Sequence, residues 1–127
     1  MARILVAEDD PRTCRLLEFR LRSRGHETIF VEDGGKAMQA AIDDKPDIIL
    51  LDIMLPVMNG FQVLQKLKLK RGTRDIPVIM LTAKVQEKDI IHGLEAGAVD
   101  YITKPFSFAE LNARIDHTLK NHIKLSG

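Results

Sequence analysis

Short apolar runs recur along the chain at regular intervals, and each is too short to form a helix. The runs are Ile4–Ala7, Thr28–Val31, Ile48–Leu51, Val78–Leu81 and Val99–Ile102. Most are apolar at successive positions rather than at alternate ones, which is typical of strands that are buried on both faces. The pattern therefore predicts five strands of a parallel sheet.

Between and after these runs, apolar residues recur every three or four positions, which predicts amphipathic helices. These stripes lie within residues 14–21, 37–41, 61–67, 90–94 and 111–119. Asp10 followed by Pro11 is typical of an N-cap and a first-turn proline. Ser107 and Glu110 match the Ser-x-x-Glu capping box, which predicts the start of the last helix.

Strand and helix thus alternate five times along the sequence. This order predicts an α/β fold, an open and doubly wound parallel sheet with helices on both faces and right-handed crossovers. No repeat, low-complexity tract or Pro/Gly/Ser-rich linker interrupts the pattern. Residues 1–127 are therefore predicted to form a single domain, with a core of residues 1–121 and a short C-terminal tail.

The composition excludes several classes of function. The chain has 127 residues, of which 45% are hydrophobic and 29% charged, and its net charge is +1. This balance gives no general attraction to nucleic acid or to an anionic membrane, and the apolar runs are too short to span a bilayer. Acidic residues from position 8 onward argue against a signal peptide. Because Cys14 is the only cysteine, we expect a reducing compartment, the cytoplasm, and a small buried thiol on a helix.

The carboxyl ends of parallel strands meet at one edge of a sheet, which is where ligands bind in such folds. The first polar residues after the five runs are, in order, Glu8–Asp10, Glu32, Asp52, Thr82 and Thr103–Lys104. We assign Glu32 to an edge strand away from the centre. The remaining residues predict a site with three or four carboxylates, one hydroxyl and one ammonium.

A small set of carboxylates suits Mg²⁺, which prefers hard oxygen ligands. Asp52 stands alone after the most apolar run, so it is the candidate nucleophile that would form an acyl phosphate. Lys104 and Thr82 are placed to neutralise and position a transferring phosphoryl group. Asp10 is expected to cap a helix rather than to bind metal. Each side chain alone also fits an ordinary loop role, and their combination on separate strand ends favours the functional site.

Four segments, in this order, resemble the receiver domains of bacterial two-component response regulators. They are "ILVAEDD", "PDIILLDIMLPVMNG", "IPVIMLTAK" and "EAGAVDYITKPF". The intervals of 30 residues from Asp52 to Thr82 and of 52 residues from Asp52 to Lys104 also resemble receiver spacing. The Glu-Asp pair is most similar to that of the transcription-factor-type receivers. The resemblance implies a flavodoxin-like, five-stranded sheet in the order 2-1-3-4-5.

The resemblance also implies a role for each acidic residue. Asp52 would accept a phosphoryl group from a sensor histidine kinase or a phosphotransfer protein. Asp9, Asp52 and the Met54 backbone carbonyl would bind Mg²⁺, and Glu8 would act through a water molecule. The protein would then be a regulatory domain and not an enzyme that acts on a separate substrate, because it would catalyse only its own phosphotransfer and dephosphorylation.

The remaining implied roles concern the switch. Thr82 would hydrogen-bond the phosphoryl group, Lys104 would pair with it, and Tyr101 would turn inward as Thr82 moves. The Lys104–Pro105 bond is expected to be cis. The face built from the fourth helix, the fifth strand and the fifth helix would change shape and regulate a partner.

Other functions were weighed against this switch. Two alternatives stay open, a receiver fragment of a longer DNA-binding response regulator and a phosphate-independent, partner-binding receiver. An FMN-binding module is disfavoured because "EDDP" would repel a phosphate group. A haloacid-dehalogenase-type phosphatase is disfavoured because Met54 stands where its second aspartate would be, and a P-loop NTPase because no Walker motif exists.

The expected partners are the phosphodonor protein and either a downstream protein target or a lost output domain, without direct binding of nucleic acid or membrane. By the resemblance, Asp100, Glu110 and Arg114 would form salt bridges across a dimer. Ile90 and Val99, however, stand where charged partners are usual in that family. We therefore expect an exposed Ile90 to favour apolar contact, and a monomer or a weak, phosphorylation-dependent dimer.

Overall fold

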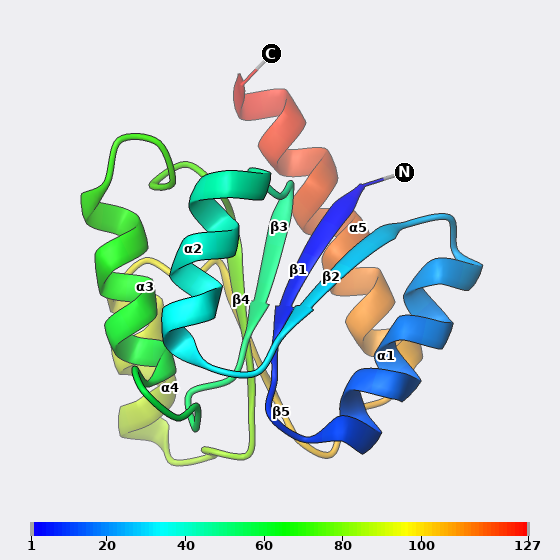
Figure 1. Ribbon diagram of the computed structural model, residues 1–127, viewed down its shortest axis with the longest axis horizontal. Coiled ribbons are helices and arrows are strands. Elements are labelled where there is room, and N and C mark those ends of the chain that lie inside the picture. Colours follow the sequence, from blue (N-terminus) through cyan, green and yellow to red (C-terminus); the bar gives the residue numbers. More distant parts are fainter. Residues whose placement is uncertain (1, 127) are drawn as a thin grey trace.

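All five apolar runs form one parallel sheet, in the strand order β2-β1-β3-β4-β5 (Figure 1). The computed structural model describes residues 2–126, and the side chains of residues 2–122. The strands are β1 (Arg3–Ala7), β2 (Glu27–Val31), β3 (Ile48–Leu51), β4 (Val78–Thr82) and β5 (Asp100–Thr103). Each strand end lies within one residue of the run that predicted it, and the expected strand order is confirmed.

Helices cover both faces of this sheet, as predicted. They are α1 (Pro11–Ser23), α2 (Gly34–Asp44), α3 (Gly60–Leu69), α4 (Glu87–Glu95) and α5 (Phe108–Ser126). Figure 1 shows α1 and α5 on one face and α2, α3 and α4 on the other. Helix α5 continues past residue 121, where the core was expected to end, while residues 1 and 127 of the predicted domain lie outside the described residues. No described helix has both the length and the apolar character needed to cross a membrane.

Residues of the central strands alternate between two apolar layers. Leu5 and Ala7 pack in the layer beneath α2 and α3, whereas Ile4 and Val6 pack in the layer beneath α1 and α5. All residues of β3 are at most 1% exposed, because both faces of this strand are covered. Full burial of one such aliphatic side chain contributes roughly 1.5–3 kcal/mol. The central strands therefore form a rigid base for whatever lies at their ends.

The register of β1 and β3 brings Asp52 beside the acidic run. Ala7 pairs with Leu51, and the Asp52 N–H donates to the Ala7 carbonyl at 3.1 Å. The Glu8 N–H donates to the Val31 carbonyl at 3.0 Å. Glu8 and Asp52 are thus the first residues beyond two adjacent strands.

Side-chain caps fix the starts of the two helices on one face of the sheet. Asp10 caps α1 as predicted: its Oδ1 accepts from the Arg12 N–H at 3.1 Å, and its Oδ2 accepts from the Thr13 hydroxyl at 2.9 Å. Ser107 precedes α5, and its Oγ accepts from the Glu110 N–H at 3.0 Å. Both caps satisfy helix N–H groups that have no partner within the helix.

The start of α3 lies against the backbone of Asp52. A Cβ atom at Gly60 would lie 2.3 Å from the Asp52 carbonyl oxygen, so only glycine fits at this position. Asn59 and Gln62 form a reciprocal capping box at the same helix start, a feature that the sequence analysis did not predict. This close approach holds the end of β3 and the start of α3 in a fixed relation.

A strained turn follows Asp52 in the β3–α3 connection. Val57 has a φ of 70°, and the Met58 N–H donates across it to the Pro56 carbonyl at 2.8 Å. A β-branched residue in the left-handed region costs roughly 1–2 kcal/mol, and Val57 is 85% exposed, so packing offsets little of this cost. The Gly34 N–H also donates to the Pro56 carbonyl, at 3.2 Å, which ties the turn to α2.

Replacing Val57 with asparagine is expected to stabilise the protein, because asparagine adopts the left-handed conformation at a lower cost. The free energy of unfolding, measured by urea denaturation, should rise by about 1 kcal/mol. Val85→Asn is the matched control, since Val85 is also exposed, at 59%, and has no positive φ. The control should change the free energy by less than about 0.5 kcal/mol. Equal effects of the two substitutions would contradict strain at Val57.

Candidate functional site

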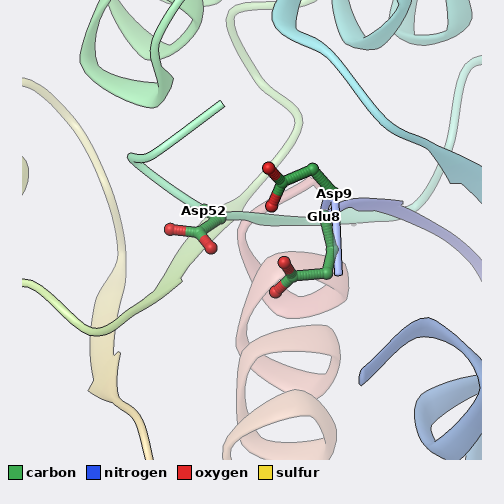
Figure 2. Close-up of side chains that lie close together, drawn as sticks. All are labelled: Glu8, Asp9 and Asp52. Carbon is green, nitrogen blue, oxygen red and sulfur yellow. The ribbon is translucent and has the colours of Figure 1, made fainter. Parts of the chain in front are cut away.

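Three acidic side chains lie together at the carboxyl ends of β1 and β3 (Figure 2). Glu8, Asp9 and Asp52 each offer one oxygen atom, and these atoms lie within 4.8 Å of one another. Glu8 and Asp52 are buried, at 3% and 5% exposed, whereas Asp9 is exposed to solvent. The structure thus brings together the carboxylates that the sequence places on separate strand ends.

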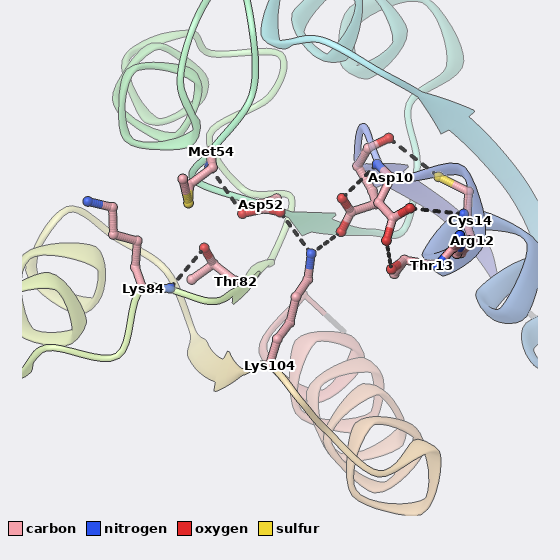
Figure 3. Close-up of polar contacts among 10 residues, drawn as sticks. Asp10, Arg12, Thr13, Cys14, Asp52, Met54, Thr82, Lys84 and Lys104 are labelled. Carbon is pink, nitrogen blue, oxygen red and sulfur yellow. Dashed lines mark hydrogen bonds and ion pairs between the residues drawn. The ribbon is translucent and has the colours of Figure 1, made fainter.

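Lys104 reaches into this cluster from the segment after β5 (Figure 3). Its Nζ donates to Asp52 Oδ2 at 2.9 Å and also bonds to Glu8 Oε1. The Lys104–Pro105 peptide bond is cis, as expected. One ammonium group therefore bridges two buried carboxylates that lie far apart in the sequence.

Burial and the Lys104 hydrogen bonds have opposite effects on the pKa values of Glu8 and Lys104. Burial raises the pKa of Glu8, and the hydrogen bonds from Lys104 and from the Asp10 N–H oppose that rise without cancelling it. Burial lowers the pKa of Lys104, but the hydrogen bonds to Glu8 and Asp52 outweigh it, so the pKa of Lys104 is raised overall. Lys104 consequently stays charged at neutral pH and supplies the positive charge that the two buried carboxylates need.

Backbone N–H groups complete the contacts of the buried carboxylates. The Met54 N–H donates to Asp52 Oδ1 at 3.1 Å, and the Asp10 N–H donates to Glu8 Oε2 at 3.0 Å. The Asp10 side chain instead caps α1, and Asp10 is not part of the acidic cluster found among the described residues. Met54 therefore contacts Asp52 through its N–H, while its carbonyl stays a predicted ligand.

Both the charge and the ligand chemistry of the cluster fit a divalent cation. With three carboxylates and one ammonium group, the fully ionised site carries two negative charges that the protein does not balance. Carboxylate oxygens are the ligands that Mg²⁺ prefers. The residues present thus suit the ion that the sequence analysis expected.

Thr82 and Tyr101 both contact the backbone of Lys84. Thr82 is fully buried at the end of β4, and its Oγ1 accepts from the Lys84 N–H at 3.4 Å (Figure 3). The Tyr101 hydroxyl donates to the Lys84 carbonyl at 2.8 Å, and burial raises the pKa of Tyr101 to about 12. Among the described side chains, no hydrogen bond joins Thr82 to Asp52. The sequence analysis missed Lys84 as the link, because backbone groups give no residue-specific signal.

The environment of the Cys14 thiol, near the acidic cluster, differs from the expected one. Cys14 is half-buried rather than buried, because it lies where α1 passes the acidic run and its Sγ donates to the Glu8 carbonyl at 3.4 Å. Burial, together with the negative charge of Glu8, raises the pKa of the Cys14 thiol to about 11. The thiol is therefore protonated at neutral pH, and a protonated thiol is a poor nucleophile.

The expected exposure of Ile90 is wrong. Ile90 is half-buried, because it shares the inner face of α4 with Gly93, a buried residue three positions further on. Ile91 takes the outer position instead and is 45% exposed. Arg114 donates to the Asp100 carboxylate at 2.9 and 3.0 Å within the same chain. This pair would have to open before either residue could form a salt bridge across a dimer.

Comparison with known proteins decides the family. The sequence model for the response regulator receiver domain matches residues 4–116. The chain belongs to this family. The receiver domain is 43% identical over 120 residues to the DNA-binding response regulator MtrA of Mycolicibacterium smegmatis, covering 94% of this chain and 51% of MtrA. It is also 43% identical over 120 residues to the DNA-binding dual master transcriptional regulator RpaA of Synechocystis sp., covering 94% of this chain and 50% of RpaA.

The predicted resemblance to transcription-factor-type receivers is thereby confirmed, and the chain spans about half the length of the curated relatives it matches. Among solved structures, the receiver domain of the sensor histidine kinase PA1611 from Pseudomonas aeruginosa is 34% identical, with a TM-score of 0.86. The match covers 94% of this chain and 98% of that one. The PA1611 domain has a magnesium ion coordinated in its active-site cleft.

Replacing Lys104 with methionine should destabilise the receiver domain at neutral pH. Methionine fills a similar volume but leaves Glu8 and Asp52 without a counter-charge, at a cost of roughly 1–3 kcal/mol in the free energy of unfolding. The raised pKa of Glu8 in the folded protein would rise further. The mutant would then lose stability as the pH rises above the unfolded-state pKa, so its penalty should be larger at about pH 7 than at about pH 4.

Urea denaturation at both pH values measures this penalty. Lys104→Arg keeps the positive charge and serves as the control, with a smaller loss that depends less on pH. A penalty for Lys104→Met that is equal at the two pH values would show that lost packing, and not the missing charge, destabilises the mutant.

Proposed function

We propose that this receiver domain is a phosphoacceptor switch that takes a phosphoryl group onto Asp52 from a phosphohistidine of a sensor histidine kinase or phosphotransfer protein. The single observation that carries the proposal is the environment of Asp52. Its carboxylate is nearly buried, accepts hydrogen bonds from the Lys104 ammonium and the Met54 N–H, and lies beside two further carboxylates. Such a setting suits a nucleophile whose product carries more negative charge.

In the proposed reaction, an oxygen of Asp52 attacks the phosphorus atom of the phosphohistidine. A phosphorus–oxygen bond forms while the phosphorus–nitrogen bond breaks, and the bonding electron pair stays on the imidazole nitrogen. The product is an acyl phosphate on Asp52, and the donor imidazole, protonated on its other ring nitrogen before the transfer, leaves as neutral histidine. Lys104 already contacts Asp52, so its ammonium is placed to pair with the added phosphoryl oxygens.

We assign Mg²⁺ to the acidic cluster, with Asp9, Asp52 and the Met54 carbonyl as direct ligands and Glu8 acting through a water molecule. Two observations support this assignment, the convergence of the three carboxylates and the magnesium ion in the PA1611 receiver domain. When bound, the ion would neutralise negative charge shared by the carboxylates and the phosphoryl group. Of the three carboxylates, Asp9 is the one exposed to solvent, and among the described residues it forms no hydrogen bond with the protein, unlike Glu8 and Asp52.

The proposed switch runs from Thr82 to Tyr101 through Lys84. A phosphoryl group adds roughly −1.5 to −2 charge and acceptor oxygens that attract the Thr82 hydroxyl. Thr82 is bonded to the Lys84 N–H and Tyr101 to the Lys84 carbonyl. Movement of Thr82 therefore shifts the loop and disturbs the contact of Tyr101. The surface formed by α4, β5 and α5 would change with it, as a two-state equilibrium that one local charge biases.

One alternative keeps specific support, namely that the chain is the receiver part of a longer DNA-binding response regulator. The relatives MtrA and RpaA are DNA-binding proteins of about twice this length. The output partner would then be a domain of the same polypeptide rather than a separate protein. In both cases we place the single domain in the cytoplasm, as a monomer or weak dimer, with catalysis limited to its own phosphorylation and dephosphorylation.

Asp52→Asn should abolish Mg²⁺-dependent labelling by the small phosphodonor acetyl phosphate, because an amide is not a nucleophile for this reaction. Intact-protein mass spectrometry measures the labelled fraction. Asp10→Asn is the matched control: it removes a carboxylate from the same rim, but asparagine caps α1 as well as aspartate does, so labelling should persist. Undiminished labelling of Asp52→Asn would identify another acceptor.

Phosphorylation should also change the intrinsic fluorescence of the protein. The chain has one tyrosine and no tryptophan, so this signal reports Tyr101 alone. Loss or rearrangement of its hydrogen bond to the Lys84 carbonyl would alter the emission intensity on addition of acetyl phosphate and Mg²⁺. Asp52→Asn should give no change, and a wild-type emission that stays constant while labelling proceeds would rule out Tyr101 as a switch residue.

A further inference from the structure

Helix α4 contains a glycine that its backbone conformation does not require. Gly93 is buried within α4 and is not among the described residues that have a positive φ, so alanine could adopt the same backbone conformation. Glycine within a helix lowers the folding equilibrium constant roughly two- to fivefold relative to alanine. The surroundings of Gly93 supply a reason for this unfavourable choice.

The ring of Tyr101 occupies the place where a side chain at position 93 would begin. A Cβ atom at Gly93 would lie 3.1 Å from Cδ2 and 3.2 Å from Cε2 of Tyr101, closer than two carbon atoms ordinarily approach. Met80, which pairs with Tyr101 across β4 and β5, lies beside the same space. We call this space, which Gly93 and Met80 border and the Tyr101 ring fills, the α4 notch.

The neighbour of Gly93 differs in kind from the neighbours of two other crowded glycines. A Cβ atom at Gly34 or Gly60 would collide with backbone atoms, which cannot move without changing the course of the chain. At Gly93 the obstacle is a side chain, and Tyr101 can leave the notch by rotation about its Cα–Cβ bond. The absence of a side chain at Gly93 therefore bears on the position of Tyr101 rather than on the fold.

Tyr101 is held in the α4 notch by its ring and by its hydroxyl group. The ring packs against the apolar layer beneath α2 and α3, and the hydroxyl donates to the Lys84 carbonyl at 2.8 Å. Burial, with smaller contributions from the negative charges of Asp89 and Asp52, raises the pKa of Tyr101 to about 12. The hydroxyl thus keeps the proton that this hydrogen bond needs, and rotation of the ring out of the notch would break the bond.

We propose that Gly93 is a positioning residue of the switch: it keeps the α4 notch open, and the size of the residue at this position sets how much of the protein has Tyr101 bonded to Lys84. A larger residue crowds the ring in the notch but not a ring that has turned to solvent, so it shifts the population toward the detached position. Overpacking of this kind shifts an equilibrium about fivefold or more. The inference rests on the proposed function for its part in signalling and adds a residue that regulates the switch.

Close packing of α4 on the sheet does not by itself require the glycine. After the two ring atoms of Tyr101, the next atom near a Cβ at Gly93 would be Met80 Cγ at 3.6 Å, which is an ordinary contact. Alanine would therefore fit between α4 and β4 if the ring were absent. This difference separates a role in positioning Tyr101 from a general role in packing.

A double-mutant cycle in urea denaturation tests whether the ring is the obstacle. In a Tyr101→Ala background, Gly93→Ala should raise the folding equilibrium constant about two- to fivefold, because only the helix preference remains. With Tyr101 present, the crowded ring should cancel or reverse this gain. Gly72→Ala is the matched control, because a Cβ atom there would meet nothing within 4 Å, and its effect should be the same in both backgrounds. Equal effects of Gly93→Ala in the two backgrounds would overturn the inference.

Gly93→Leu tests the position of the ring directly, because leucine favours a helix but cannot share the α4 notch with Tyr101. The chain has one tyrosine and no tryptophan, so quenching of the intrinsic emission by acrylamide reports the exposure of Tyr101. The quenching constant should rise in Gly93→Leu and stay unchanged in Gly72→Leu, with circular dichroism showing that both are folded. An unchanged constant in folded Gly93→Leu would contradict the inference, and if this variant does not fold, the alanine cycle decides.

Acetyl phosphate and Mg²⁺ separate this inference from the proposed function. Labelling of Asp52 should persist in Gly93→Leu, but without the change in Tyr101 emission expected of wild type, because the ring has already left the notch. An emission change as large as that of wild type would overturn the inference. If wild type is not labelled, or is labelled at constant emission, the proposed function or its Tyr101 step fails, and the cycle and the quenching still decide the role of Gly93.

Discussion

The Lys104 ammonium is the group on which the arrangement of this receiver domain depends. It lies between Glu8 and Asp52, two nearly buried carboxylates that would otherwise repel each other at the ends of neighbouring strands. Unpaired buried charges are costly, so the carboxylates can remain ionised and adjacent only with a cation at hand. The same arrangement makes the site suitable for a metal ion and a phosphoryl group, since its excess negative charge attracts a cation and the Lys104 ammonium can pair with phosphoryl oxygens.

The two layers of helices contribute differently to the structure around Lys104, Glu8 and Asp52. On one side, α2 and α3 hold the end of β3 in place: the start of α3 approaches the Asp52 backbone so closely that only glycine fits at Gly60, and α2 ties down the strained turn at Val57. On the other side, α1 buries Leu17 and Leu21 in the core and presents Leu16 and Phe19 outward. A single helix thus contributes to the core through one face and presents a basic, partly apolar surface to solvent through the other.

Signal transmission, as we propose it, depends on weak contacts rather than on strong ones. The Lys84 backbone has a long hydrogen bond to Thr82 and a short one to Tyr101, at 3.4 and 2.8 Å. The hydrogen bond to Thr82 can be exchanged at little cost for a bond to a phosphoryl oxygen. The hydrogen bond to Tyr101 then has to adjust, because both bonds are made by the backbone of Lys84. Within the chain, the Asp100–Arg114 pair closes the neighbouring surface of β5 and α5, so a change there has a salt bridge to rearrange.

Sequence alone determined the strands, the helix stripes, the Asp10 cap and the convergence of acidic residues, because hydrophobic periodicity and strand-end polarity are local signals that a parallel sheet translates directly into position. The four receiver motifs added the strand order. Only the tertiary structure decided that Lys104 bonds to Glu8 as well as to Asp52, that the Lys84 backbone joins Thr82 to Tyr101, and that Ile90 turns inward while Ile91 is exposed. These features depend on the register of neighbouring strands, on the rotation of a short helix and on backbone groups that every residue carries, so no pattern of side chains along the chain specifies them.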